Sequence, residues 1–327
     1  MTGVSAAIQP LPAPFQRPRL LLGTGRKTSA AVGHLFTLWA GASLVIPRLG
    51  PRQRQRVAAW FATRTLKALD VTIRVRESCL ETKGPRLLVA NHISWLDVYA
   101  LNAVVKARFL AKSETRTWPL FGVITQAFDT LFIVRGSCRD AARVKDAVAA
   151  ALREGDTIVV FPEGTTSDGT VLRRFYPALF QAAIDASVEV QPVAIRYPGH
   201  DGLPNLAAAF VDDMTFFDSF RRIVTQPGLT VELTFGPAIP AAGLTRRQLA
   251  QLARQHIAQQ LAPRGCAIEP QVVCPSRERR TRTIRVVAGA GRPTRQPHGE
   301  RPLRGCPVDG RQVLPVADRR RARRRPQ

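Results

Sequence analysis

The stretch that decides the fold is Leu87-Leu88-Val89-Ala90-Asn91-His92-Ile93-Ser94-Trp95-Leu96-Asp97. Its apolar run from Leu87 to Ala90 predicts a buried strand, and the pattern from Trp95 onward predicts a helix. A histidine therefore lies where a strand ends and a helix begins, and a carboxylate follows it after four intervening residues. A neutral imidazole becomes an effective base when a carboxylate fixes its tautomer and stabilises the cation that it forms. His92 and Asp97 are therefore a candidate general-base pair.

The same residues also allow a purely structural interpretation. Ser94 at the N-cap and Asp97 three residues later match a capping box in front of an apolar helix. On spacing alone, His92 is more often an ordinary turn residue than a base. The rest of the chain has to decide between the two interpretations.

Outward from this stretch, strands and helices alternate from residue 71 to about residue 240. The predicted strands are Val71–Val75, Arg86–Asn91, Arg108–Lys112, Thr130–Arg135, Thr157–Pro162, Val188–Tyr197 and Thr230–Phe235. The predicted helices are Trp95–Val105, Arg139–Arg153, Pro177–Ala186 and Arg246–Leu261. Such alternation is typical of a single α/β domain with a mostly parallel or mixed sheet flanked by helices.

Two further polar segments lie at predicted strand ends. Arg135 closes one strand, and Phe161-Pro162-Glu163-Gly164-Thr165 closes another. Each alone has a simpler explanation, because Arg135 can be a solvated strand terminus and Glu163-Gly164 can be a turn. Ligands of α/β sheets gather where strands end and helices begin. Three such segments at one edge of one sheet therefore favour a site for an anionic or hydroxyl-bearing ligand.

The chain has 327 residues, 45% of them hydrophobic, but its net charge of +24 is unusually high. Residues 271–327 contain 16 Arg and 4 acidic residues. Their net charge of +12 is half of the net charge of the whole chain. They are rich in Pro and Gly and lack Phe, Trp and Tyr, which predicts a disordered tail. This tail can attract anionic headgroups, bind nucleic acid or have no selected function. Nucleic acid is not the expected partner, because no aromatic side chains interleave with the arginines.

Residues 28–47 carry no formal charge and are flanked by basic residues on both sides. Their length could span a bilayer, but their Ser, Thr and His content fits a helix in one leaflet at least as well. A second helix is predicted from Arg54 to Leu69, with Val57, Trp60 and Phe61 on one side. This helix can be plain core packing or part of a basic, apolar surface. We expect the two helices to lie against an anionic membrane surface.

Five cysteines are scattered at positions 79, 138, 266, 274 and 306, and the five histidines are equally dispersed. No C-x-x-C pair is present, and no histidine lies near a cysteine at the spacing of metal ligands. We therefore expect neither a metal site nor a disulfide framework, and a reducing compartment is the simple inference.

Four motifs in order resemble those of the glycerolipid acyltransferases of the lysophosphatidic acid acyltransferase type. They are Asn91-His92 with Asp97, Phe132-Ile133-Val134-Arg135, Phe161-Pro162-Glu163-Gly164-Thr165 and Val190-Gln191-Pro192-Val193-Ala194-Ile195. Any one of them is weak evidence, but four in this order are specific. The resemblance covers roughly residues 65 to 240.

The resemblance implies a mechanism without a nucleophilic serine. His92 would take the proton from the acceptor hydroxyl, and Asp97 would orient His92. Arg135 would hold a phosphate of the acceptor, and Glu163, Gly164 and Thr165 would position its glycerol part. The co-substrates would be a lysolipid, expected to be lysophosphatidate, and an acyl donor, either acyl-acyl carrier protein or acyl-coenzyme A. No cofactor and no metal are implied.

Two departures from the family pattern affect the expected acceptor. Many members have Gly and Asp where this chain has Asp129 and Val134, and many have a second phosphate-binding Arg where this chain has Thr166. Arg173 or Arg174 can compensate for the missing guanidinium. Otherwise the acceptor is another lysolipid, such as a lyso-ornithine lipid.

Two other classes of protein remain as alternatives. A lipid hydrolase would need a nucleophile, but the chain has no G-x-S-x-G motif and Ser94 lies only two residues from His92. A non-enzymatic basic protein that binds membrane or nucleic acid would explain the charge and leave the four motifs unexplained.

The expected organisation has four parts. A flexible N-terminus covers residues 1–27, membrane-associated helices cover 28–69, the catalytic domain covers 70–265, and the Arg-rich tail covers 266–327. The expected location is the inner or cytoplasmic membrane, with the catalytic domain facing the cytosol.

Overall fold

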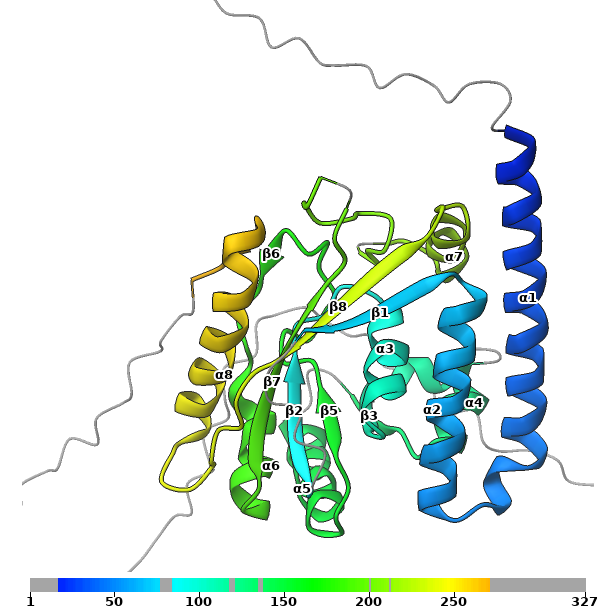
Figure 1. The fold of residues 1–327 in the computed structure, drawn as a ribbon. Coiled ribbons are helices and arrows are strands. Elements are labelled where there is room, and N and C mark those ends of the chain that lie inside the picture. Colours follow the sequence, from blue (N-terminus) through cyan, green and yellow to red (C-terminus); the bar gives the residue numbers. More distant parts are fainter. Residues whose placement is uncertain are drawn as a thin grey trace, which may run out of the picture. The chain divides into compact units, whose positions relative to one another are not determined.

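A seven-stranded sheet forms the centre of the fold in the computed structural model of the chain (Figure 1). The structure describes residues 17–76, 84–117, 121–134, 138–199, 201–211 and 213–270. The strands of this sheet are β1 (Val71–Arg76), β2 (Arg86–Ala90), β3 (Arg108–Lys112), β4 (Leu131–Ile133), β5 (Ile158–Val160), β7 (Glu189–Arg196) and β8 (Leu229–Phe235). Their order is β1-β8-β7-β2-β5-β3-β4, and only the β7–β8 pair is antiparallel. The predicted mostly parallel α/β sheet is confirmed.

Helices cover both faces of this sheet. The helices are α1 (Arg17–Leu44), α2 (Pro51–Ala68), α3 (Leu96–Val104), α4 (Phe121–Ala127), α5 (Cys138–Arg153), α6 (Phe180–Ala186), α7 (Phe216–Val224) and α8 (Arg246–Leu261). Side chains of α2, α3 and α7 pack on one face, and side chains of α5, α6 and α8 pack on the other. The sheet is therefore the middle of three layers.

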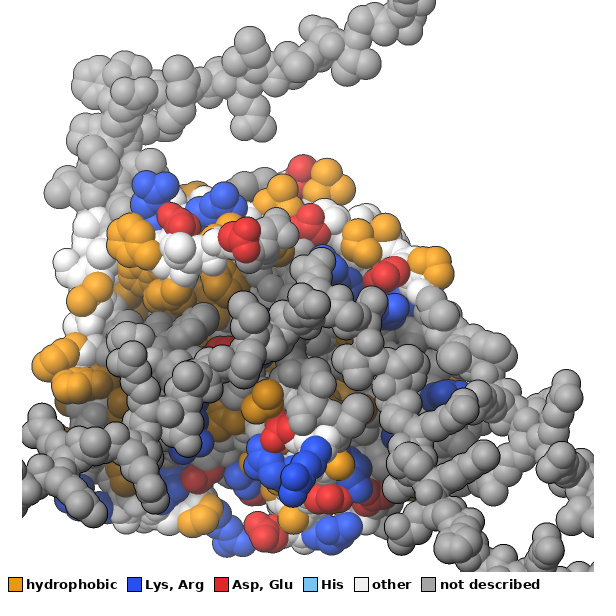
Figure 2. Space-filling view, turned by 180° about the vertical axis from the view of Figure 1, so that it is seen from behind, with side chains coloured by type: hydrophobic (Ala, Val, Ile, Leu, Met, Phe, Trp, Pro, Cys, Tyr) orange, Lys and Arg blue, Asp and Glu red, His pale blue; other side chains and the backbone are white. Residues whose placement is uncertain are grey.

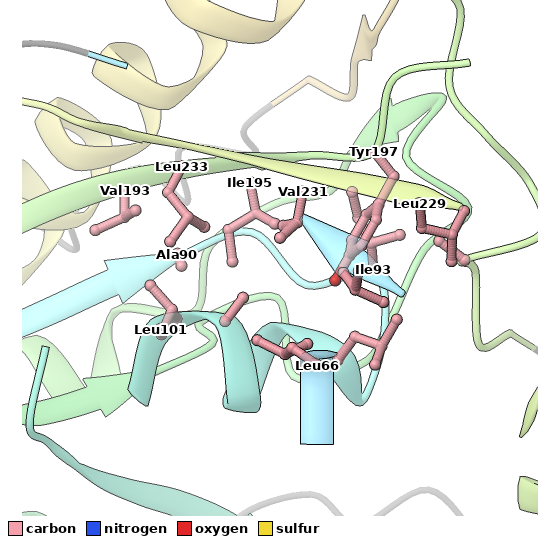
Figure 3. Close-up of a cluster of buried hydrophobic side chains, with 14 of the residues drawn as sticks. Leu66, Ala90, Ile93, Leu101, Val193, Ile195, Tyr197, Leu229, Val231 and Leu233 are labelled. Atoms are coloured by element: carbon pink, nitrogen blue, oxygen red, sulfur yellow. The ribbon is translucent and has the colours of Figure 1, made fainter. Parts of the chain in front are cut away.

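Strand β2 shows how the sequence builds these layers. Successive side chains of a strand point to opposite faces. Leu88 and Ala90 accordingly join the cluster on the α3 side, while Leu87 and Val89 join the cluster on the α5 side. All five residues of β2 are buried, as expected for a central parallel strand covered on both faces. Figure 3 shows the α3-side cluster, in which side chains of β7 and β8 face those of α3.

Helices α1 and α2 run side by side and are joined by a short 3-10 turn, Ile46–Arg48 (Figure 1). The buried face of α1 carries Ala31, Leu38 and Ala42, and these pack toward α2 and α4. The exposed side carries Val32, Phe36 and Trp39. Within the described ranges, no helix combines the length and the apolarity that crossing a bilayer would need.

Several element boundaries differ from the sequence prediction. Helix α1 begins at Arg17, inside the segment expected to be flexible, because Leu20-Leu21-Leu22 favours a helix. Helices α4 and α7 were not predicted. The expected tail also begins too early, since β9 (Ala267–Ile268) pairs with β6 (Val171–Leu172). Residues 1–16 and 271–327 lie outside the described residues.

Candidate active site

His92 follows β2 directly, and its ring contacts the carboxylate of Asp97. The distance from His92 Nδ1 to Asp97 Oδ2 is 2.9 Å. This contact places the ring proton on Nδ1, because a carboxylate accepts, and leaves Nε2 with a free lone pair. The imidazole also stacks on the ring of Phe161, with centroids 3.9 Å apart. The structure therefore brings the two predicted catalytic residues together.

The Asp97 side chain is fully buried, and both of its oxygens accept hydrogen bonds. Besides the imidazole, Oδ2 accepts the amides of Ile93 at 2.7 Å and Ser94 at 2.9 Å. Oδ1 accepts the hydroxyl of Tyr197 at 2.7 Å. A buried carboxylate needs such partners to offset its lost hydration. Asp97 is thus held rigidly, and it holds the imidazole in turn.

The structural interpretation of this stretch is also partly correct. Asp97 accepts the Ser94 amide, which is one half of a capping box. The Ser94 side chain does not complete the box; its Oγ accepts the Leu96 amide at 3.3 Å and is fully buried. One carboxylate therefore serves both the helix start and the histidine. Burial also removes Ser94 as a nucleophile, which argues against the hydrolase alternative.

Asn91 fixes the point where β2 stops. Its side-chain amide donates to the Ile195 carbonyl at 2.9 Å, and its side-chain oxygen accepts the Ile195 amide at 2.7 Å. The side chain thereby takes the place of a strand backbone and joins the ends of β2 and β7. His92 consequently leaves the sheet at a defined place, and its carbonyl accepts the Ser167 amide at 2.8 Å.

Glu163 lies on the other side of His92, in the loop after β5. Its carboxylate accepts the main-chain amides of His92 at 2.9 Å and Arg173 at 3.1 Å. The side chain is buried, and this burial raises the pKa of Glu163 to about 7 in spite of the two amides. These contacts make Glu163 a brace for the main chain of His92. Its contact with the acceptor stays a prediction.

Gly164 and Thr165, the other two residues of this motif, line a cavity next to His92. Gly164 has a φ of 71°, a left-handed conformation that glycine adopts without strain. Thr166, which stands where many family members have arginine, donates its hydroxyl to the Phe210 carbonyl. Arg135 lies outside the described residues, so its predicted contact with a phosphate stays a prediction.

The cavity beside His92 has a volume of about 1900 Å³. Its walls carry mainly apolar side chains, including Val98, Phe109, Ile124 and Phe128. At its far end, Arg54 of α2 forms an ion pair with Asp129, and Arg108 of β3 forms one with Asp156, both at 2.7 Å. Asp129 has a φ of 54°, a left-handed conformation that is uncommon for residues other than glycine. This volume is well above that of a usual small-molecule pocket and fits long apolar chains.

In the described part of the chain, no group of His, Cys, Asp and Glu side chains has an arrangement that could hold a metal ion. What the site does offer is a braced histidine base at the edge of a large, mainly apolar cavity. The class of protein that this fold and site define is an enzyme that activates a hydroxyl group of a lipid-like substrate.

Comparisons with known proteins identify the family. Residues 71–196 match the family model described as Acyltransferase. A lyso-ornithine lipid O-acyltransferase of Pseudomonas aeruginosa is 37% identical over 243 residues, which cover 74% of this chain and 93% of that protein. A 1-acyl-sn-glycerol-3-phosphate acyltransferase of Neisseria gonorrhoeae is 37% identical over 185 residues, covering 57% of this chain and 72% of that protein. The chain therefore belongs to the lysolipid acyltransferases of the lysophosphatidic acid acyltransferase family.

A solved structure shares the fold. It is that of the 1-acyl-sn-glycerophosphate (LPA) acyltransferase PlsC from Thermotoga maritima, with a TM-score of 0.53 and 22% sequence identity. The match covers 75% of this chain and 97% of that protein. Family membership implies two substrates, a lysolipid acceptor and an acyl donor.

Sequence reasoning missed Tyr197, whose hydroxyl completes the partners of Asp97. The signal was present, because Tyr197 lies two residues beyond Ile195 and therefore shares its face of β7. Figure 3 shows the Tyr197 ring beside Ile93 in the cluster on that face. Burial and the Asp97 charge raise the pKa of Tyr197, so its hydroxyl keeps its proton and donates.

Proposed function

We propose that this protein moves a fatty acyl group from acyl-acyl carrier protein or acyl-coenzyme A to the free hydroxyl of lysophosphatidate, giving phosphatidate. The observation that carries the proposal is the His92 imidazole, which Asp97 braces at 2.9 Å in the wall of the cavity. This arrangement leaves Nε2 free to accept a proton. The acceptor hydroxyl is the group that supplies it.

The chemistry balances without a covalent enzyme intermediate. Nε2 of His92 takes the hydroxyl proton while the acceptor oxygen attacks the thioester carbonyl. The carbon–sulfur bond then breaks, the ester forms, and the imidazolium returns its proton to the departing thiolate. Asp97 stabilises the imidazolium during this cycle, because its carboxylate is fixed by four donors from His92, Ile93, Ser94 and Tyr197.

The cavity supplies a place for an acyl chain. Its apolar walls run from the His92 loop to the start of α2, and a fatty chain in such a cavity leaves water. Each buried methylene contributes about 0.8 kcal/mol to binding. The reacting carbonyl is thereby held near His92 while the chain extends away from it.

A second acceptor, lyso-ornithine lipid, is favoured by one specific observation. The Thr166 hydroxyl donates a hydrogen bond to the Phe210 carbonyl. Many family members have a second phosphate-binding arginine at this position, so this chain lacks that cation. The P. aeruginosa relative is named for this acceptor. Loss of one guanidinium weakens binding of a phosphomonoester more than binding of a headgroup without phosphate.

Membrane attachment is part of the proposal. Helix α1 exposes Val32, Phe36 and Trp39, and α2 exposes Trp60, with Arg64 at 5.6 Å from its ring. Aromatic side chains next to cations fit the headgroup region of an anionic leaflet. The proposed location is the cytoplasmic face of the inner membrane.

The test is a lysolipid panel with one acyl donor. The purified full-length chain is incubated with labelled acyl-coenzyme A or acyl-acyl carrier protein and, in turn, lysophosphatidate and lyso-ornithine lipid. We expect ester formation with lysophosphatidate, and a loss of about 10³-fold or more in His92→Ala. Transfer to lyso-ornithine lipid alone would favour the second acceptor. Full activity of His92→Ala would remove His92 as the base, and no transfer to any lysolipid would refute the function.

A further inference from the structure

One side of helix α7 packs against the residues around the cavity. Thr215 caps its start by accepting the Asp218 amide. Ser219 and Ile223 are fully buried, and Ser219 accepts the indole hydrogen of Trp95 at 3.0 Å. Phe216 lines the cavity and lies against the Trp95 ring, with centroids 5.1 Å apart. Since Trp95 is three residues from His92, α7 forms part of the cavity wall close to the catalytic loop.

The other side of α7 is turned to solvent and has an unusual composition. Phe217 is 70% exposed, the highest value among the exposed large hydrophobic residues of the described chain. Arg221 follows one turn later on the same side, and Arg222 is exposed beside it. A bare aromatic ring next to two cations has no folding benefit in water, but it matches the boundary between acyl chains and phosphate headgroups.

Helix α1 lies next to α7. Lys27 of α1 donates to the carbonyl of Gln226, just after α7, at 2.8 Å. Figure 2 shows hydrophobic side chains over α7 and along the α1 edge, around a recess with a hydrophobic lining. The two helices therefore present apolar and basic side chains on the face where the cavity lies.

We propose that α7 is a second membrane contact, which sets the cavity opening against an anionic lipid surface. Phe217 enters the leaflet, and Arg221 and Arg222 bind the phosphate groups of neighbouring lipids. Phe216, the residue before Phe217, lines the cavity, so a lysolipid passes from the leaflet to His92 along this helix without crossing bulk water. The expected effect on turnover rests on the proposed acyltransferase function. The expected membrane binding does not depend on it.

A lipid surface fits this side of α7 better than a protein partner does. Arg221 and Arg222 outnumber Asp218, the acidic residue next to Phe217, and the resulting net positive charge complements the negative charge of an anionic leaflet. The opposite side of the helix meets a cavity suited to lipid chains, which a protein partner would close.

The experiment compares vesicle binding and turnover in the full-length protein. Vesicles of equal parts phosphatidylglycerol and phosphatidylcholine are sedimented with the native chain, Phe217→Ser and the double variant R221E/R222E. The matched control is R246E/R247E, an adjacent exposed pair on α8 with the same change in charge. We expect about tenfold weaker binding for each α7 variant and near-native binding for the control. Phe217→Trp is expected to keep binding.

Turnover is then measured with the lysolipid acceptor either in these vesicles or in detergent micelles. We expect the α7 variants to lose about tenfold in vesicles and to keep the native rate in micelles, because the cavity and His92 are intact. Native vesicle binding by both variants would overturn the inference, as would equal losses in vesicles and micelles. If the native chain transfers no acyl group in micelles, the proposed function fails, while the binding series still decides the role of α7.

Discussion

The segment from β2 into the first turn of α3 and the loop after β5 meet at His92, and each contributes one buried carboxylate with a different task. Asp97, in the first turn of α3, contacts the imidazole itself and the amides of Ile93 and Ser94 just before that helix. Glu163, in the loop after β5, accepts the main-chain amides of His92 and Arg173 and so joins two distant segments. The comparison teaches that one carboxylate sets the chemistry of the ring and the other sets the path of the chain that carries it.

Asp97→Asn should have the largest effect, because it acts on the ring directly. An amide can donate to Nδ1 instead of accepting from it, which favours the wrong imidazole tautomer. We expect kcat to fall about 10³-fold with KM little changed. Asp146→Asn, an exposed position on α5, serves as control and should keep the native rate. A near-native kcat for Asp97→Asn would mean that the Asp97 carboxylate has no chemical role.

Glu163→Gln tests the role of the second carboxylate through the pH dependence of the unfolding free energy. Burial raises the pKa of Glu163 from 4.5 to about 7, so the folded chain keeps a proton that the unfolded chain releases. The stabilisation is fully present below pH 4.5 and is lost as pH rises through about 7. Relative to Glu163→Gln, the unfolding free energy of the native protein should therefore fall by about 3 kcal/mol across this window.

The measurement is urea denaturation of both proteins at pH values on either side of the window. The difference between the two proteins isolates Glu163 from other titrating groups. A difference that stays constant with pH would contradict a buried, proton-binding Glu163.

Tyr197→Phe should have the smallest effect of the three, because Tyr197 acts on the ring only through Asp97. Removing its hydroxyl leaves Asp97 Oδ1 buried without a donor, which costs about 1–3 kcal/mol. We expect kcat to fall about tenfold at unchanged KM, together with a lower melting temperature. A lower melting temperature with native kcat would make Tyr197 a structural residue only.

The sequence alone predicted the sheet and the His92–Asp97 contact, because both depend on local patterns. Strand β2 contains the apolar run from Leu87 to Ala90, and His92 and Asp97 are close together along the chain. The Tyr197 contact with Asp97 spans 100 residues and depends on the order of β7 and β2 in the sheet, which local patterns do not contain. Helix α7 was missed although Thr215 and Asp218 form a helix-start signal, because a helix of nine residues is too short for a helical period to stand out in the sequence.

The central claim is that His92 is a base whose free nitrogen is Nε2. The most direct test is long-range proton–nitrogen correlation NMR of the native chain labelled with ¹⁵N-histidine, with His92→Asn used to assign the signal. The account predicts that neutral His92 carries its proton on Nδ1, bonded to Asp97, and that Nε2 is unprotonated. A neutral ring with its proton on Nε2 would contradict the account, because that nitrogen could not take a proton from a lipid hydroxyl.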